Sequence, residues 1–226
     1  MKKVSIAIDG PSGAGKSTIT RYLAAKMGLV YVDTGAMYRA LGYYAVSNNI
    51  KADDRDAVVS MLKEIRLDIS YDGGAQRIFL NDEDSTEKIR TPGISMAASA
   101  ISAIPEVRAF LLRLQRSLAE RHSVIMDGRD IGTVILPDAD VKIFLTASPC
   151  SRAQRRYEEL ISKGQNVAFE DVLRELEQRD HNDCTRAAAP LKKADDAVLI
   201  DTTGLSLEDG MAAVENKLME LLTDVL

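Results

Sequence analysis

Residues 10–17 read GPSGAGKS and constrain the fold more than any other feature of this sequence. The short β-branched run at residues 4–8 predicts a strand directly before this segment. Apolar residues at every fourth position of residues 16–27, followed by Gly28, predict a helix directly after it. The segment therefore matches the pattern G-x-x-x-x-G-K-S/T in the strand, turn and helix context in which that pattern binds phosphate.

Glycines in such a loop let successive backbone N–H groups converge on phosphate oxygens, and the helix N-terminus adds partial positive charge. We expect Lys16 to reach the β- and γ-phosphates and the hydroxyl of Ser17 to bind Mg²⁺. A glycine-rich turn with a surface lysine is the alternative, and the flanking strand and helix disfavour it. The sequence thus predicts a nucleoside triphosphate site formed by Gly10, Pro11, Ser12, Gly13, Ala14, Gly15, Lys16, Ser17 and Thr18.

Strands and helices are expected to alternate along the rest of the chain. Four further segments are short and apolar nearly throughout, which is typical of strands covered on both faces. The alternation predicts an α/β fold, in which one domain over residues 1–226 has a doubly wound, five-stranded parallel sheet with helices on both faces. The further strands are residues 29–32, 124–126, 141–145 and 197–200, and the further helices are residues 35–46, 54–65, 105–119, 151–162, 169–179 and 207–222.

Residues 62–91 interrupt this alternation. Residues 67–71 and 77–80 alternate polar and apolar side chains, and the segment between them contains Asp72-Gly73-Gly74, which is typical of a tight turn. We therefore expect a small antiparallel unit inserted into the main domain.

Net charge limits the class of partner. The 226 residues carry a net charge of −5, and aromatic residues make up 5% with no tryptophan. A negative surface repels nucleic acid, and few aromatic side chains are available to stack on bases. An anionic ligand must therefore be small and be met by a local cluster of positive charge.

The hydropathy pattern predicts no membrane span, because no apolar stretch approaches the ~18 residues that a membrane helix needs. The apolar run after Lys3 ends at Asp9, which is too short for a signal peptide, and we expect a cytoplasmic protein. Cys150 and Cys184 lack CxxC spacing and a histidine pattern, so neither a disulfide framework nor a structural zinc site is expected.

Opposite charges crowd the end of one expected strand. Asp127 directly follows residues 124–126, in the manner of a carboxylate that orients Mg²⁺ or its waters, and Arg129 and Asp130 come next. Ligands bind at the carboxyl ends of strands in open α/β sheets. The alternative is a surface turn with an ion pair.

Three arginines on one expected helix also point to an anion. Arg152, Arg155 and Arg156 stand at i, i+3 and i+4, which stacks like charges on one helical face. This spacing favours a phosphate clamp, and a solvated face paired with Glu158 and Glu159 is the alternative.

Two further polar segments admit a binding or a structural interpretation. Asp33 follows an expected strand and enters a helix that carries Tyr38 and Arg39, which fits either a binding loop or a simple helix cap. Arg179, Asp183 and Arg186 form a charged series that equally fits helical ion pairing. His122 and His181 form no dyad with a cysteine or serine, so nucleophilic catalysis is not predicted.

Four motifs occur together in this sequence, namely residues 10–17, residues 33–39 (DTGAMYR), residues 127–133 (DGRDIGT), and residues 179–183 (RDHND) with Arg186 and residues 189–191 (APL). This set resembles the bacterial cytidylate kinases, and the resemblance runs from Val4 to about Thr202. It implies a nucleoside monophosphate kinase that transfers the γ-phosphoryl group of ATP, bound with Mg²⁺, to CMP or dCMP. It also implies a monophosphate-binding region with the insertion at about residues 62–91, and a helical lid at about residues 148–165.

The resemblance also implies a role for each matching residue. The phosphate of CMP would be held by Tyr38, Arg39, Arg129 and Arg186. Ser99, Arg108 and Asp130, with Thr34, would bind the cytosine, and Asp183 a ribose hydroxyl. The residues acting on the transferring phosphates would be Lys16, Arg129, Arg156, Arg179 and Arg186, with Mg²⁺ at Ser17 and, through water, at Asp127.

Two other function classes remain as alternatives. Another phosphate-loop kinase, for UMP or a small metabolite, would differ only in its acceptor-side residues. A nucleotide switch is disfavoured, because the D-x-x-G lookalike at residues 201–204 lies near the end of the chain and residues 216–219 lack the guanine-binding aspartate. We expect a monomer whose partners are small-molecule substrates, with no nucleic acid and no membrane.

Overall fold

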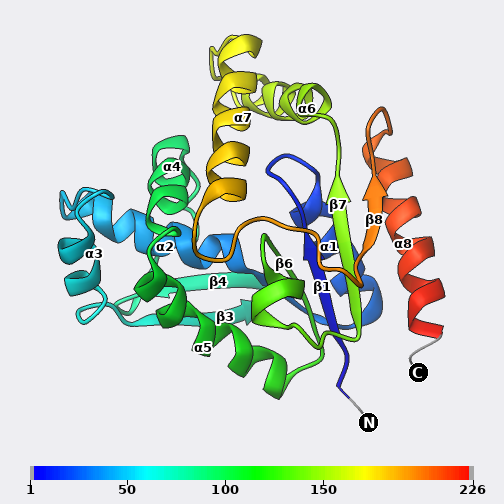
Figure 1. The fold of residues 1–226 in the computed structure, drawn as a ribbon, viewed down its shortest axis with the longest axis horizontal. Helices are drawn as coiled ribbons and strands as arrows, with labels where there is room; N and C mark the ends of the chain where they lie inside the picture. The colour runs from blue at the N-terminus through cyan, green and yellow to red at the C-terminus, as the bar shows by residue number, and fades with distance from the viewer. Residues whose placement is uncertain (1–2, 224–226) are drawn as a thin grey trace.

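The computed structural model describes residues 3–223, and its centre is a five-stranded parallel sheet in the order β2-β6-β1-β7-β8 (Figure 1). All five strands lie where the sequence predicts them, and the expected α/β fold is confirmed. The strands are β1 (Ser5–Asp9), β2 (Val30–Asp33), β6 (Val124–Gly128), β7 (Val141–Thr146) and β8 (Val198–Asp201).

Helices cover both faces of this sheet because side chains alternate along each strand. Ile6 and Ile8 of β1 share a buried cluster with α1 (Lys16–Met27) and α8 (Leu207–Thr223). Ala7 between them belongs to a second cluster with α2 (Thr34–Ser47) and α5 (Pro105–Arg121). The sheet is therefore doubly wound, as the alternation of strands and helices predicts.

The strand β8 differs from the expectation that every strand is covered on both faces. Leu199 in its middle is 57% exposed, and exposed and half-buried residues alternate along the strand. The reason is topological, because β8 lies at the edge of the sheet and pairs only with β7. An apolar run of four residues does not distinguish a central strand from such an edge.

The expected antiparallel unit is present as the sheet β3 (Leu67–Asp72), β4 (Ala75–Leu80) and β5 (Glu83–Asp84). Gly73 and Gly74 form the two-residue turn with φ of 56° and 81°, which favours glycine at both positions. Ile78 and Leu80 join the buried cluster of α2 and α5. The helix before it, α3 (Arg55–Met61), ends four residues earlier than the sequence predicts.

Besides the short strand β5, two elements were not predicted from the sequence. The helix α4 (Pro92–Ile101) begins after Thr91, whose side chain accepts from the N–H of Ile94, with proline at the first turn. It crosses α2 closely, since a Cβ at Gly42 would lie 2.9 Å from the Ala98 nitrogen. A π-helical turn, η1 (Ile131–Ile135), follows the segment that contains Arg129 and Asp130.

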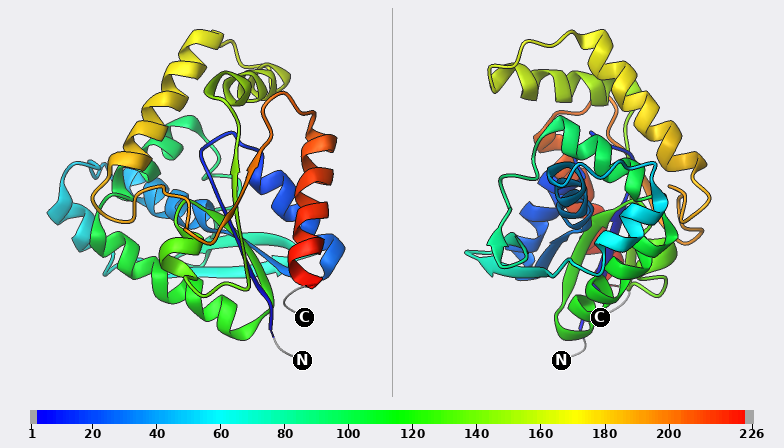
Figure 2. Two further views of the ribbon diagram at one scale, coloured as in Figure 1. Left: turned by 45° about the vertical axis from the view of Figure 1, so that its right-hand side comes forward. Right: turned by 90° about the vertical axis from the view of Figure 1, so that its left-hand side faces the viewer.

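The helices α6 (Pro149–Ser162) and α7 (Phe169–Thr185) lie above the carboxyl end of β7, and Figure 2 shows them arching over the rest of the molecule. They share a small buried cluster of Ala153, Leu160 and Val172, separate from the two clusters on the sheet. The helix α7 extends six residues beyond its predicted end at Arg179. This extension places Asp183 on the helix.

No single helix within residues 3–223 has both the length and the apolarity to cross a membrane. The helices at residues 93–101 and 105–121 reach this length and apolarity only when taken together, and they meet at a bend of 99°. Ile101 and Leu111 of this pair are fully buried in the main cluster.

Candidate active site

A cavity of about 760 Å³ opens at the carboxyl ends of the parallel strands, between the phosphate loop, α2, α4 and the helices α6 and α7. Most of the site residues expected from the sequence line it. Gly10, Pro11 and Ala14 belong to the loop but do not line the cavity. The expected residues that do are Ser12, Gly13, Gly15, Lys16, Ser17, Thr18, Thr34, Tyr38, Arg39, Ser99, Arg108, Asp127, Arg129, Asp130, Arg156, Arg179, Asp183 and Arg186.

The phosphate loop is shaped by glycine at the end of β1. Gly10 has φ of 148°, and a Cβ there would lie 1.9 Å from the carbonyl oxygen of Leu145, so no other residue fits. The buried ammonium of Lys16 donates to the Pro11 carbonyl at 2.7 Å across the loop. Burial lowers the pKa of Lys16, and the nearby charge of Arg129 lowers it further.

Three cations therefore lie close together and repel one another. Burial lowers the pKa of Arg179, with Arg129 again as the next cause, and its buried Nε has no hydrogen-bond partner among the described residues. Lys16, Arg129 and Arg179 all line the cavity. Because like charges in a low-dielectric site destabilise one another, this arrangement is typical of a site that receives an anion.

Ser17 and Asp127 form the candidate metal site. The Ser17 hydroxyl donates to Oδ2 of Asp127 at 2.6 Å, and the Tyr31 hydroxyl lies 3.4 Å from Oδ1. The described residues contain no group of three or more histidine, cysteine, aspartate or glutamate side chains that fits a metal ion. One hydroxyl and one carboxylate suit Mg²⁺, which keeps several waters and binds through one or two protein groups together with phosphates.

Asp127 gives a pH-dependent prediction. Burial, with the charge of Asp33, raises the pKa of Asp127 from 3.8 to about 6, so ionising this carboxyl group is less favourable in the folded chain than in the unfolded chain. The contribution of Asp127 to stability therefore falls as pH rises from about 4 to about 6. We expect Asp127→Asn to be more stable than the wild type at pH 8 and equally stable below about pH 4.

Urea unfolding of both proteins at the two pH values measures this difference. The exposed Asp53→Asn substitution is the matched control, and as a surface change it should have little effect on stability. A gain in Asp127→Asn that does not depend on pH would contradict the burial argument.

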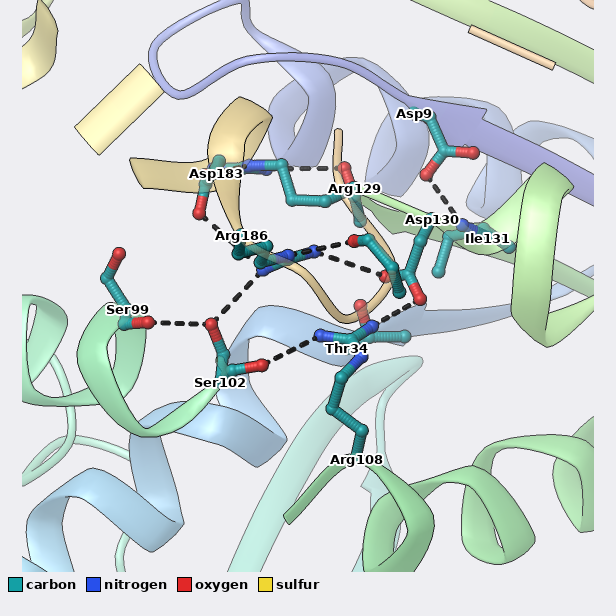
Figure 3. Close-up of polar contacts among 12 residues, drawn as sticks. Asp9, Thr34, Ser99, Ser102, Arg108, Arg129, Asp130, Ile131, Asp183 and Arg186 are labelled. Atoms are coloured by element: carbon teal, nitrogen blue, oxygen red, sulfur yellow. Dashed lines mark hydrogen bonds and ion pairs between the residues drawn. The ribbon is translucent and has the colours of Figure 1, made fainter. Parts of the chain in front are cut away.

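The part of the cavity that the sequence analysis expects to bind the acceptor nucleotide, called the acceptor side below, contains two arginines that meet at Ser102 (Figure 3). Arg108 forms an ion pair with Asp130 and donates to the Ser102 carbonyl at 3.2 Å. Arg186 donates to the Ser102 hydroxyl at 3.1 Å and lies 3.8 Å from Asp130. The Tyr38 ring packs against the Arg108 guanidinium, with 5.4 Å between the ring centre and Cζ of Arg108. The Asp130 carboxylate, which accepts hydrogen bonds, thus lies beside the Arg108 and Arg186 guanidinium groups, which donate them.

Arg129 and Asp183 join the segment that follows β6 to α7. Nε of Arg129 donates to Oδ2 of Asp183 at 2.9 Å, and Arg186 lies 3.6 Å from the other oxygen. Burial would raise the pKa of Asp183, but the charge of Arg129 holds it below the ordinary value. Among the described residues the ion pairs of Asp183 are with Arg129 and Arg186, so the helical pairing with Arg179 that the sequence allowed does not form.

The sequence and the fold are both similar to those of known proteins. The sequence model of the cytidylate kinase family matches residues 6–221. The chain belongs to the cytidylate kinase family. A cytidylate kinase of Caldicellulosiruptor saccharolyticus is 50% identical over all of this chain and 98% of its own length. A cytidylate kinase of Caldanaerobacter subterraneus subsp. tengcongensis is 52% identical over 91% of this chain and 90% of that protein.

Among solved structures, an uncharacterized protein from Eubacterium ventriosum has a TM-score of 0.53 and covers 97% of this chain and 99% of its own. At 14% identity the likeness extends to the fold alone. The match to the family model and the identity with the two relatives confirm the resemblance to cytidylate kinases that the sequence analysis found.

The three arginines of α6 do not act as one group in this cytidylate kinase family member. Arg152 is buried, donates to the Ser12 carbonyl at 2.9 Å and pairs with Asp180 at 2.6 Å. Its role is to pack α6 against the phosphate loop and α7, so the prediction of a three-arginine clamp is wrong for this residue. Arg155 and Arg156 line the cavity, and Arg156 pairs with Glu159 at 2.7 Å.

Several residues at this site were not predicted from the sequence. Ser102 was missed because its only local signal is one serine in a charge-free stretch. Asp9 accepts from the N–H groups of Ile131 and Gly132 at 2.8 and 2.7 Å, which fixes the segment after Asp130 (Figure 3). A polar residue ending an apolar strand was the available signal for Asp9. Residues 205–207 also line the cavity, and no sequence signal marked them.

Proposed function

We propose that the chain transfers the γ-phosphoryl group of ATP to CMP or dCMP, forming ADP and CDP or dCDP. One observation carries this proposal: a single cavity of about 760 Å³ is lined both by Lys16 and Ser17 and by the Arg108 and Asp130 pair. Donor and acceptor phosphates bound at these two places would approach each other within one space. In-line transfer needs that proximity more than it needs a reactive side chain.

On the donor side, the phosphate loop from Gly10 to Thr18 binds the phosphates of ATP through its N–H groups and Lys16. Ser17 and, through water, Asp127 hold Mg²⁺, which supplies charge neutralisation on the phosphate oxygens when bound. The fit of one hydroxyl and one buried carboxylate at hydrogen-bond distance supports this assignment.

On the acceptor side, Tyr38, Arg39, Arg129 and Arg186 hold the phosphate of CMP. A phosphate monoester has its second pKa near ~6 and is largely dianionic at neutral pH, so no general base is needed. Lys16 and the arginines instead neutralise charge on the transferring group, for which the planar fork of arginine is suited.

Cytosine is bound by Ser99, Arg108 and Asp130 with Thr34, and Asp183 takes a ribose hydroxyl. Cytosine presents an amino donor at N4 and acceptors at N3 and O2, which suit a carboxylate beside a guanidinium. Uracil reverses the polarity at N3 and at position 4. A buried group left unpaired costs ~1–3 kcal/mol, which gives about a tenfold or larger preference for cytosine.

Residues 148–165 act as a lid that closes over bound nucleotides and excludes water, within a single kinase domain of residues 1–226. The small buried cluster that α6 and α7 share supports this, because it is separate from the two clusters on the sheet and leaves α6 outside the main core. Arg156 and Arg179 reach the transferring phosphates from this side. The antiparallel unit at about residues 62–91 belongs to the monophosphate-binding region.

The chain acts as a monomer on small-molecule substrates, without nucleic acid or membrane as a partner. The net charge of −5 supports the exclusion of nucleic acid, since polyanions are repelled.

ADP release from Mg-ATP by the purified protein tests the function, with CMP, dCMP, UMP, AMP, GMP and shikimate offered in turn as acceptors. Fast release with the cytosine nucleotides alone is the expected result. Release with a different acceptor would reject the base-binding assignment of Arg108 and Asp130. No stimulation by any acceptor would favour a nucleotide switch instead.

A further inference from the structure

A buried amide stands in an otherwise apolar row of the antiparallel unit. Gln76, Ile78 and Leu80 face inward from β4, with exposures of 9%, 1% and 6%. Ile78 and Leu80 pack into the main core. Burying a polar side chain is costly unless it is hydrogen-bonded, so packing alone does not account for glutamine in this row.

The amide of Gln76 binds the backbone of one residue, Asp33. The Asp33 N–H donates to Oε1 of Gln76 at 2.8 Å, and Nε2 donates to the Asp33 carbonyl at 3.1 Å. Asp33 ends β2, which lies at the edge of the parallel sheet and pairs only with β6. The glutamine side chain thus supplies the two hydrogen bonds that a further strand would supply at this edge.

Asp33, held in place by Gln76, also contacts α2 through its own side chain. Its Oδ1 accepts from the Ala36 N–H at 2.8 Å and caps α2. Its Oδ2 pairs with Arg39 at 2.9 Å. Thr34, the next residue, donates to the Asp127 carbonyl at 2.8 Å. The position of Asp33 therefore sets the first turns of α2, which carry Tyr38 and Arg39 toward the cavity.

We propose that Gln76 is a positioning residue for the acceptor nucleotide, and that holding Asp33 is how the antiparallel unit serves the reaction. Gln76 does not itself line the cavity and acts through Asp33 and Arg39. The inference rests on the proposed function, since its kinetic readout is the affinity for CMP. A residue that only stabilised the fold would affect CMP and ATP alike.

Gln76→Met tests the proposal, because methionine keeps the length of the side chain and removes both hydrogen bonds. The expected result is a rise of about tenfold in KM for CMP, since the bound conformation of α2 becomes less populated. KM for ATP and kcat should stay within about twofold. Gln76→Glu keeps the acceptor for the Asp33 N–H but turns a second acceptor oxygen toward the Asp33 carbonyl, so its KM for CMP should rise as well.

Thr86→Val is the matched control within the same unit. The Thr86 hydroxyl accepts from the Ile78 N–H at 3.0 Å and has no contact with Asp33 among the hydrogen bonds of the described residues. This variant should lose thermal stability without a change in KM for CMP. If Gln76→Met raises both KM values together, or leaves both unchanged, the positioning role is rejected.

Amide hydrogen exchange at Asp33 distinguishes this inference from the proposed function. Should the wild type release no ADP in response to CMP, the proposed function fails, and exchange then decides whether Gln76 holds Asp33. About tenfold faster exchange of the Asp33 amide in Gln76→Met supports the assignment. Unchanged exchange overturns it. If Gln76→Met does not fold, the same comparison is made with Gln76→Leu, which also removes both hydrogen bonds.

Discussion

Arg129→Ala is expected to lower kcat/KM for CMP by about 10³-fold while KM for ATP changes less than about threefold. Arg129 follows β6, pairs with Asp183 at 2.9 Å and lies close enough to Lys16 for its charge to lower the pKa of that ammonium. A bound phosphate between these cations removes their repulsion. In the proposed function, loss of Arg129 would therefore weaken binding of the acceptor phosphate and leave the charge that develops during transfer less neutralised.

Steady-state ADP release with varied CMP and varied ATP measures the two constants. Arg113→Ala on α5 is the matched control, because Arg113 is exposed and outside the cavity, and it should behave as wild type. Circular dichroism checks that Arg129→Ala is folded, as expected from the remaining contact between Asp183 and Arg186 at 3.6 Å. Unchanged CMP kinetics would reject the assignment of Arg129.

Lys16→Met is expected to lower kcat by about 10³-fold. In the free protein the Lys16 ammonium is buried and donates to the Pro11 carbonyl at 2.7 Å, so it is held in the loop before any ligand arrives. A preorganised cation of this kind stabilises charge on the β- and γ-phosphates without reorganisation during the reaction. Methionine has a similar length and no charge.

Lys142→Met is the matched control for the removal of a buried lysine. Lys142 is 9% exposed, lies outside the cavity and pairs with Asp196 at 2.7 Å. We expect its kcat to stay within about twofold of the wild type, since it does not touch the nucleotides. Calorimetric binding of CMP to Lys16→Met should remain close to wild type. A fall in kcat of less than about tenfold would show that the loop backbone suffices without its lysine.

Local patterns determined most of the fold. The strand, glycine loop and helix over residues 4–27 form as the pattern predicts, because turn chemistry and fourfold apolar spacing act between near neighbours. The five parallel strands and the hairpin at Gly73 and Gly74 were predictable for the same reason. The phosphate loop and Asp127 were predicted from pattern and position, and most other site residues were proposed from resemblance to the cytidylate kinases. Most of these residues line one cavity in the folded chain.

Tertiary structure decided the features that depend on contacts between residues far apart in the sequence. Helical spacing put Arg152, Arg155 and Arg156 on one face, and only the position of the phosphate loop made Arg152 a packing residue. The exposure of β8 depends on its place at the sheet edge. Gln76 and Asp33 are 43 positions apart in sequence. No local propensity encodes such a contact, because its free energy arises only when the chain brings two buried polar groups together.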